Sequence, residues 1–301
     1  MRGEAGDRLT SVGQIQYGDL LIGRGTPYSY RRLTGWGDLP ALDSGTVPRS
    51  GGHGAYPGLL LAQSRTVGLD GLIVRAPRAH IGAAVEQFEA ATVPVDVEMP
   101  LVVWVDERGP RLVWARCLRR AIPVDVGYRV GTIVGGAVEW EATDPRRYGL
   151  LERTAAATLP TPEPGLNWDV DPGPERAAWP LDFGAVGTAG GMSVTNTGTA
   201  VTHPVIEFRG PVLRPSLTNL HTGDVLEYDL PLAAGDVLVV DTRAGTVTLN
   251  ATASRLYTAT SRSVPEEAFA LAPGTTDLAF RAAPDSDPAG TVLVRYRPAY
   301  W

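Results

Sequence analysis

The stretch V-E-W-E-A-T-D-P-R-R-Y, residues 138–148, divides the chain because a predicted strand ends in it. Pro145 cannot continue a strand ladder, since proline has a fixed φ and no backbone N–H. Beyond it the chain carries prolines at positions 160, 162, 164, 172, 174 and 180 with little apolar periodicity, which is typical of a semi-rigid linker. The sequence therefore predicts a first domain over residues 1–150, a linker over 151–180 and a second domain over 181–301.

A chain of 301 residues is long enough for two domains that each bury a core. Its 44% hydrophobic and 20% charged residues are ordinary for a soluble globular protein, and no apolar run approaches the roughly 20 residues of a membrane-spanning helix. The polar first eight residues predict no secretion leader. A single cysteine, Cys117, predicts neither a disulfide framework nor a cysteine zinc site.

The charge balance argues against nucleic acid as the main ligand. The formal net charge is -6 and the pI is near 5.3, whereas phosphate binding requires clustered positive charge. Pairs such as Arg119-Arg120 are too small to change this balance.

The first domain is predicted to be mainly β with one helix. Residues 81–91 place Ile81, Ala84, Val85, Phe88 and Ala91 on one face at helical spacing. Alternating apolar residues or short apolar runs bounded by turns predict strands elsewhere, at residues 14–22, 28–33, 65–74, 101–106, 111–122 and 128–140. Residues 107–110 contain Gly and Pro and predict a hairpin between two of these strands. The expected architecture is a β-barrel-like or split-barrel sheet with one packed helix.

A long segment, residues 34–58, has glycines, prolines and isolated aromatics with almost no periodicity. Loops of this length in a compact domain usually have a function. An antiparallel sheet with open edges gains from a head-to-tail contact that closes into a ring. We therefore expect this segment to be an oligomer-interface loop with exposed apolar anchors at Trp36, Leu39, Leu42 and Tyr56.

The second domain is predicted to be all β. Strands are expected near residues 191–195, 201–209, 212–219, 224–230, 236–241, 246–250, 277–282 and 291–296. Short turn signals, such as Asn196-Thr197-Gly198 and Ala233-Ala234-Gly235-Asp236, separate them at regular intervals. This spacing is typical of a β-sandwich or jelly roll.

No motif predicts catalysis, a cofactor or a metal. Asp43-Ser44-Gly45-Thr46 has the letters of an aspartic-protease loop, but only one copy is present and its flanks do not form a convincing strand, so a turn is expected. Cys117 lies in an alternating strand and is expected in the core. The histidines at positions 53, 80, 203 and 221 have no metal-ligand spacing.

Aromatic residues of the second half could form a sugar-stacking platform, although core or linker packing is the more common use of such residues. The available set is Trp168, Trp179, Tyr228, Tyr257, Tyr296, Tyr300 and Trp301. A glycan-binding adhesion protein that acts through its C-terminal β-sandwich is therefore an alternative reading, with a host cell-surface glycan as its ligand.

Several short motifs occur in a characteristic order. They are Gly25-Thr26-Pro27-Tyr28, Leu33-Thr34-Gly35-Trp36, residues 140–148, residues 194–200, residues 204–211, Leu232-Ala233-Ala234-Gly235-Asp236 and Val294-Arg295-Tyr296-Arg297-Pro298. In order and spacing the chain resembles the siphophage distal tail protein family, the phage tail family or minor tail protein of actinobacterial phages.

The resemblance implies a structural virion protein made in the host cytoplasm and located at the phage tail tip. It implies a homohexameric ring of first domains that joins the tail tube protein to tail-tip, baseplate or receptor-binding proteins. It also implies that the second domain is a galectin-like sandwich pointing outward.

Overall fold

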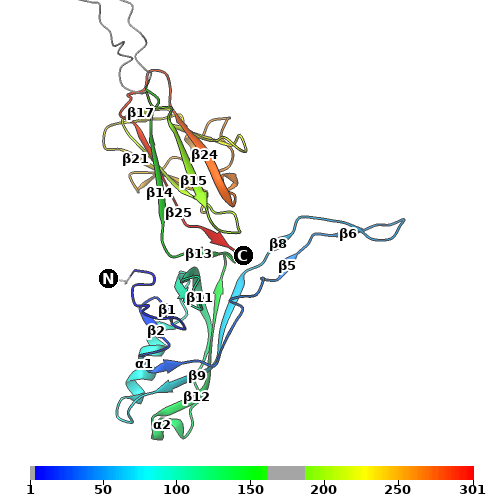
Figure 1. Ribbon diagram of the computed structural model, residues 1–301, viewed down its shortest axis with the longest axis vertical. Coiled ribbons are helices and arrows are strands. Elements are labelled where there is room, and N and C mark those ends of the chain that lie inside the picture. The colour runs from blue at the N-terminus through cyan, green and yellow to red at the C-terminus, as the bar shows by residue number, and fades with distance from the viewer. Residues whose placement is uncertain (1–3, 162–186) are drawn as a thin grey trace, which may run out of the picture. The chain divides into compact units, whose positions relative to one another are not determined.

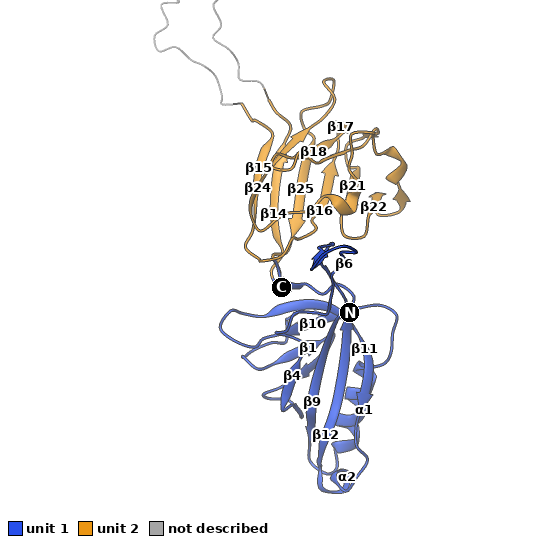
Figure 2. Ribbon diagram, turned by 90° about the vertical axis from the view of Figure 1, so that its right-hand side faces the viewer, with its two compact units in different colours: residues 1–150, 299–301 blue, residues 151–298 orange. Residues whose placement is uncertain are grey.

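The computed structural model describes residues 4–161 and 187–301. The chain forms two compact units (Figures 1 and 2): unit 1 comprises residues 1–150 and 299–301, and unit 2 comprises residues 151–298. The backbone thus passes between the units twice. Among the described residues, no helix combines the length and apolar character needed to cross a membrane.

Unit 1 is built on an antiparallel ten-stranded sheet. The central order is β2-β1-β10-β11-β12-β9-β3, with β4 also paired to β9, and with β13 joining β11 to β26. The strands are β1 (Ile15–Tyr17), β2 (Leu20–Ile22), β3 (Tyr28–Ser29), β4 (Arg32–Thr34), β9 (Arg65–Arg75), β10 (Met99–Val103), β11 (Arg111–Ala121), β12 (Thr132–Ala142), β13 (Arg147–Gly149) and β26 (Ala299–Tyr300). The Gly23 amide, just after β2, donates to the Tyr28 carbonyl in β3 at 2.9 Å. The two ends of the strand path therefore meet, and the sheet curls into a nearly closed barrel.

The long strands and the helix of unit 1 agree with their predictions. Residues 65–74 and 111–122 correspond to β9 and β11, and β10 pairs with β11 as a hairpin. The single strand predicted over residues 14–22 is wrong, because the chain turns at Gly18, where φ is +53°, and β1 pairs with β2. The strand predicted from residue 128 starts later, because a short helix, α2 (Gly127–Val130), precedes β12.

The helix α1 (Ile81–Ala91) buries Ile81, Ala84, Val85 and Phe88 against the sheet. Its apolar residues recur every three or four positions, and this spacing sets one face of the helix toward the core. Tyr28 packs its ring 5.3 Å from that of Phe88, and its hydroxyl donates to the Ala84 carbonyl at 2.7 Å. This contact fixes the helix to strand β3.

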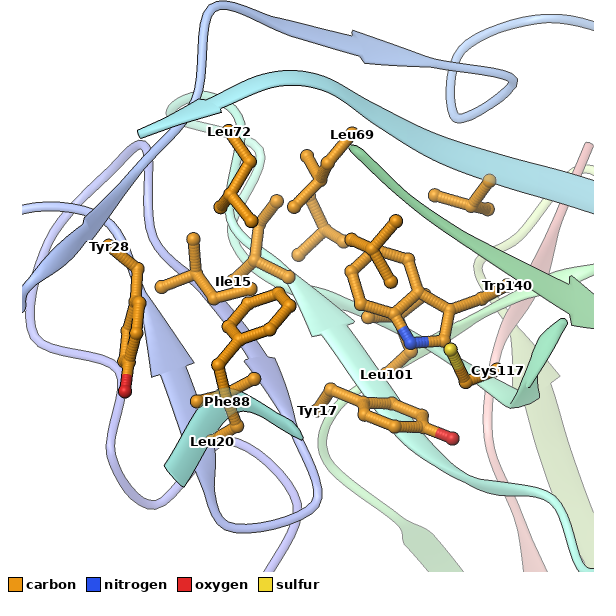
Figure 3. Close-up of a cluster of buried hydrophobic side chains, with 14 of the residues drawn as sticks. Ile15, Tyr17, Leu20, Tyr28, Leu69, Leu72, Phe88, Leu101, Cys117 and Trp140 are labelled. Atoms are coloured by element: carbon orange, nitrogen blue, oxygen red, sulfur yellow. The ribbon is translucent and has the colours of Figure 1, made fainter. Parts of the chain in front are cut away.

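The core of unit 1 gathers around Trp140, which is fully buried (Figure 3). Its ring lies 5.4 Å from the ring of Tyr17, and Cys117 packs in the same cluster. Burial raises the pKa of the Cys117 thiol, so Cys117 is a small core residue as predicted, and not a reactive one.

Unit 2 is a sandwich of two main antiparallel sheets with one small two-stranded sheet. One sheet has the order β14-β25-β16-β21-β22-β23 and the other β15-β24-β18-β19, while β17 pairs with β20. The strands are β14 (Arg153–Thr158), β15 (Gly191–Asn196), β16 (Val205–Arg209), β17 (Val212–Leu213), β18 (Ser216–Asn219), β19 (Val225–Glu227), β20 (Pro231–Leu232), β21 (Val237–Asp241), β22 (Thr246–Leu249), β23 (Ala253–Ser254), β24 (Gly274–Arg281) and β25 (Thr291–Tyr296). Alternate residues of both sheets, such as Phe208 and Phe280, form one core.

The predicted domain limits need two corrections. Residues 153–158, assigned to the linker, form strand β14, which pairs along its whole length with β25. The last three residues, assigned to the second domain, belong to unit 1, where β26 pairs with β13. Both segments are short and find their partners far away in sequence. Residues 162–180 of the predicted linker and residues 181–186 of the predicted second domain lie outside the described residues.

Buried tyrosines should make unit 1 less stable in alkali. Burial raises the pKa of Tyr17 to about 12 and also raises the pKa of Tyr28 and of Tyr30. Above pH 10 the unfolded chain loses these protons while the folded chain keeps them, so stability falls as pH rises from 10 toward 12. Urea unfolding should show a loss on the order of 1 kcal/mol for Tyr17 alone between pH 9 and pH 11.

Tyr17→Phe should remove that share of the pH dependence, whereas Tyr257→Phe, at an exposed position, should leave it unchanged. An equal pH dependence in the Tyr17→Phe variant and in the original protein would contradict this assignment.

Candidate oligomer-interface arm

Residues 39–62 form a two-stranded ribbon, here called the arm, which extends away from the sheet of unit 1 (Figure 1). Near its base β5 (Leu42–Asp43) pairs with β8 (Leu61–Ala62), and near its tip β6 (Val47–Pro48) pairs with β7 (Ala55–Tyr56). The segment predicted as an irregular loop is therefore a hairpin-like ribbon that continues to residue 62.

The two paired parts of the arm meet at a close crossing of glycines. Gly45 has φ of +51°, which favours glycine, and a Cβ added at Gly58 would lie 2.3 Å from the Gly45 carbonyl oxygen. Only glycine fits at position 58 without moving the backbone. The crossing fixes how the outer part of the arm continues from the inner part.

The arm exposes large apolar side chains instead of burying them. Leu59, Leu60 and Leu61 are 80%, 64% and 60% exposed. The other exposed apolar residues of the arm are Leu39, Leu42, Val47 and Tyr56. A two-stranded ribbon with apolar residues on its surface cannot bury them by itself. Such a surface is characteristic of a contact with another protein.

The base of the arm is held by Arg65, which is almost completely buried. Its Nη1 donates to the carbonyls of Gly35, Trp36 and Asp38 at 2.7, 3.2 and 2.8 Å. Its Nε donates to the Pro145 carbonyl at 2.7 Å. One side chain thus joins the start of the arm to the turn that ends strand β12.

A second guanidinium group meets the first at the same carbonyl. Arg147 Nη1 donates to the Trp36 carbonyl at 3.0 Å, and Nη2 donates to the Trp301 carbonyl. Burial lowers the pKa of Arg65 to about 10. The nearby positive charge of Arg147 lowers this pKa further, whereas the negative charge of Asp38 partly raises it again. Arg65 therefore keeps its charge at neutral pH, and its buried charge is balanced chiefly by carbonyl dipoles.

The predicted anchors divide into two groups. Leu39, Leu42 and Tyr56 lie exposed on the arm, with the Arg49 guanidinium 4.8 Å from the Tyr56 ring centre. Trp36 is a correction: it is only 5% exposed and belongs to the core of unit 1. Its backbone is held by Arg65 and Arg147, so its indole packs inward at the arm's base.

Sequence reasoning missed Val47 and the three leucines at 59–61. The run Leu59-Leu60-Leu61 was a usable signal, because three consecutive large apolar residues after Gly58 cannot all face one side of a strand. A strand that carries them must therefore be covered on both faces or leave an apolar side chain exposed.

The candidate chemical motifs have ordinary structural roles. Asp43-Ser44-Gly45-Thr46 lies exposed on the arm, where the Asp43 carboxylate accepts a hydrogen bond from the Gly45 amide at 3.2 Å. Residues 44–46 form the irregular link between β5 and β6, so the turn predicted for this motif is wrong. Within the described residues, no group of three or more His, Cys, Asp or Glu residues could hold a metal ion.

The aromatic set gives no sugar platform in the described part of unit 2. Tyr228 and Tyr296 are buried, and their hydroxyls donate to Glu266 and to the Thr195 carbonyl. Tyr300 belongs to unit 1, where the Arg111 guanidinium lies 3.7 Å above its ring centre. Tyr257 is exposed on unit 2. Trp168 and Trp179 lie outside the described residues, and Trp301 is partly exposed in unit 1.

Comparisons with known proteins give one family match. A family model described as the siphovirus-type tail component, C-terminal domain, matches residues 197–300, which lie mostly in unit 2. A search of curated protein sequences found no match.

Solved structures share the fold over nearly the whole chain. One is the crystal structure of the Dit protein of phage SPP1, which is described as a paradigm of the hub adsorption apparatus in phages that infect Gram-positive bacteria. Its sequence is 14% identical to this chain, and the TM-score is 0.65. The match covers 97% of this chain and 100% of that one. A chain of the phage P2 baseplate in its activated conformation with Ca is 8% identical with a TM-score of 0.51, covering 94% and 97%. The predicted mainly-β fold class is thereby confirmed.

Proposed function

We propose that this chain, a siphovirus-type tail component of the siphophage distal tail protein family, forms a ring that joins the tail tube to the baseplate or receptor-binding apparatus. The match over residues 197–300 confirms the resemblance predicted from the motifs. The role is structural, and the protein resides in the virion. The number of six copies follows from the resemblance.

The observation that carries this proposal is the arm. It presents Leu59, Leu60 and Leu61 to solvent on a ribbon too thin to bury them, while Arg65 fixes its base to unit 1. Exposed apolar surface of this kind is stabilised when a second copy covers it. A head-to-tail contact between copies closes into a ring when the rotation between neighbours divides a full turn. The arm supplies the protruding half of such a contact.

Serine replacement of the three leucines tests the arm. Leu59→Ser/Leu60→Ser/Leu61→Ser should convert the oligomer to a monomer, because it removes the apolar area that a neighbour would cover. Light scattering should be run on the full chain alone and with tail tube protein, in case the ring needs a template. The unfolding temperature of the monomer should change little, since exposed side chains contribute little to folding.

A matched control replaces three exposed apolar residues of unit 2, Leu151→Ser/Val201→Ser/Leu220→Ser, and should keep the oligomer. An oligomer that survives the arm substitutions would assign ring closure to another surface. Absence of the protein from purified tails by mass spectrometry would overturn the proposed function itself.

The glycan-binding alternative stays a prediction. A glycan array probed with the full chain separates the two functions, because a strong and specific signal lost on Tyr257→Ala would favour adhesion through unit 2. No signal is expected if the role is only structural.

A further inference from the structure

An exposed apolar cluster lies at one end of unit 1, in the segment between β11 and β12 and at the start of β12. Val124, Val126 and Val130 are 87%, 68% and 67% exposed, and Val134 is also exposed. We call these four residues the valine knob. They lie at the end of β9 and β11 opposite to Arg65 and Arg111, and so opposite to the base of the arm. The knob and the arm are therefore separate surfaces of unit 1.

The knob is a built structure with fixed backbone contacts. Gly127 packs so closely on the start of β12 that an added Cβ would lie 2.4 Å from the Thr132 carbonyl oxygen. The Gly127 amide donates a hydrogen bond to the Asp125 carboxylate at 2.7 Å. Gly131, with φ of +78°, ends α2, and its carbonyl accepts a hydrogen bond from the Ala76 amide at 3.1 Å. These contacts hold the valines outward on a firm support.

Three exposed arginines lie on the same backbone segments as the valines or on segments beside them. Arg75 ends β9, Arg78 follows it beside Gly131, and Arg129 belongs to α2. Within the described parts of the chain, none of the three guanidinium groups forms an ion pair with a carboxylate. In a chain of net charge -6, this end of unit 1 thus combines unpaired positive charge with exposed apolar area.

The charges limit what can cover the knob. Two knobs facing each other would bring six arginines together, which like-charge repulsion disfavours. The arm of a neighbouring copy is already engaged in the proposed ring closure. A surface with an apolar centre and a rim of Asp or Glu would bury the valines and pair the arginines, as complementary interfaces do.

We propose that the valine knob docks a different protein of the phage particle, through an apolar surface rimmed by carboxylates. The inference rests on the proposed function and adds to it a second contact surface, distinct from the arm. The arm joins copies of this chain, and the knob joins the assembled chain to a neighbour of complementary charge.

Charge reversal of the three arginines beside the valine knob, here called the rim arginines, tests the proposal. The test uses a phage whose own gene for this chain is disabled and which receives the full chain from a plasmid. Arg75→Glu/Arg78→Glu/Arg129→Glu should leave the oligomer of the purified chain unchanged by light scattering and lower the yield of infectious particles at least tenfold. Reversal of three exposed arginines of unit 2, Arg153→Glu/Arg209→Glu/Arg243→Glu, should keep the yield within twofold. A normal yield with the rim variant would overturn the knob proposal alone.

A photo-crosslinking side chain at Val126 then identifies what covers the knob. The expected product in purified particles joins Val126 to an Asp- or Glu-containing peptide of another protein, and the rim variant should lose it. The same side chain at exposed Leu220 of unit 2 should not form that product. A product with residues 39–62 of a second copy, or no product at all, would overturn the proposal. Absence of the unmodified chain from particles would instead overturn the proposed function.

Discussion

Replacing Arg65 by alanine is expected to release the base of the arm and to lower the free energy of unfolding of unit 1 by about 3–5 kcal/mol. The side chain donates to four carbonyls, on Gly35, Trp36, Asp38 and Pro145. Its removal leaves buried acceptors unpaired, and each such group costs roughly 1–3 kcal/mol. Urea unfolding of the full chain, followed by tryptophan fluorescence, measures the loss.

The same substitution should weaken the oligomer, because an arm that moves freely at its base loses more conformational entropy when it binds a neighbouring copy. Arg65→Lys keeps the charge but not the forked set of donors, so it should recover only part of the stability. Arg108→Ala is the matched control, since this arginine is exposed and, among the described residues, forms an ion pair only with the nearby Asp106, and it should leave stability nearly unchanged. Equal effects of Arg65→Ala and Arg108→Ala would contradict the role of Arg65.

Trp140→Ala should destabilise unit 1 by about 3–5 kcal/mol and could prevent its folding at 37 °C. The indole is fully buried, contacts Tyr17, and lies in the middle of the core cluster. Its loss removes apolar burial and leaves a cavity that the surrounding strands cannot fill. Differential scanning calorimetry should show a lower transition for unit 1 while the transition of unit 2 stays in place.

The control for Trp140 is Leu118→Ala on the neighbouring strand, because Leu118 is more than half exposed. It should shift the transition of unit 1 little. A variant whose two transitions both shift by the same amount would show that the units unfold together, and the stability change could then not be assigned to unit 1 alone.

The elements that the sequence determined are those with a strong local period. Residues 81–91 form the helix α1 with the predicted face buried, since its apolar positions recur at helical spacing. Strands β9 and β11 are long enough to alternate several times, so their patterns are distinct. Cys117 is buried for the same reason, because it occupies an inward position of an alternating strand.

The candidate interface was only partly readable. The absence of periodicity indicated a segment that does not pack against the core of its own domain, and Leu39, Leu42 and Tyr56 are indeed exposed. Trp36 lies in the same segment but is buried, because Arg65 and Arg147 hold its backbone against unit 1 from positions 29 and 111 residues away. No local pattern in residues 34–58 contains that information.

Tertiary pairing alone decided where the units begin and end. Strand β14 looked like linker because its Arg-Thr-Ala-Ala-Ala-Thr sequence has little apolar content, yet it pairs with β25 near the other end of the chain. Strand β26 has two residues, and it returns to unit 1 because β13 offers it an edge and Arg111 lies over the Tyr300 ring. A helix can be predicted from apolar residues three and four positions apart in the sequence. Strands β14 and β26 instead take their stability from partners more than a hundred residues away, which no local pattern reveals.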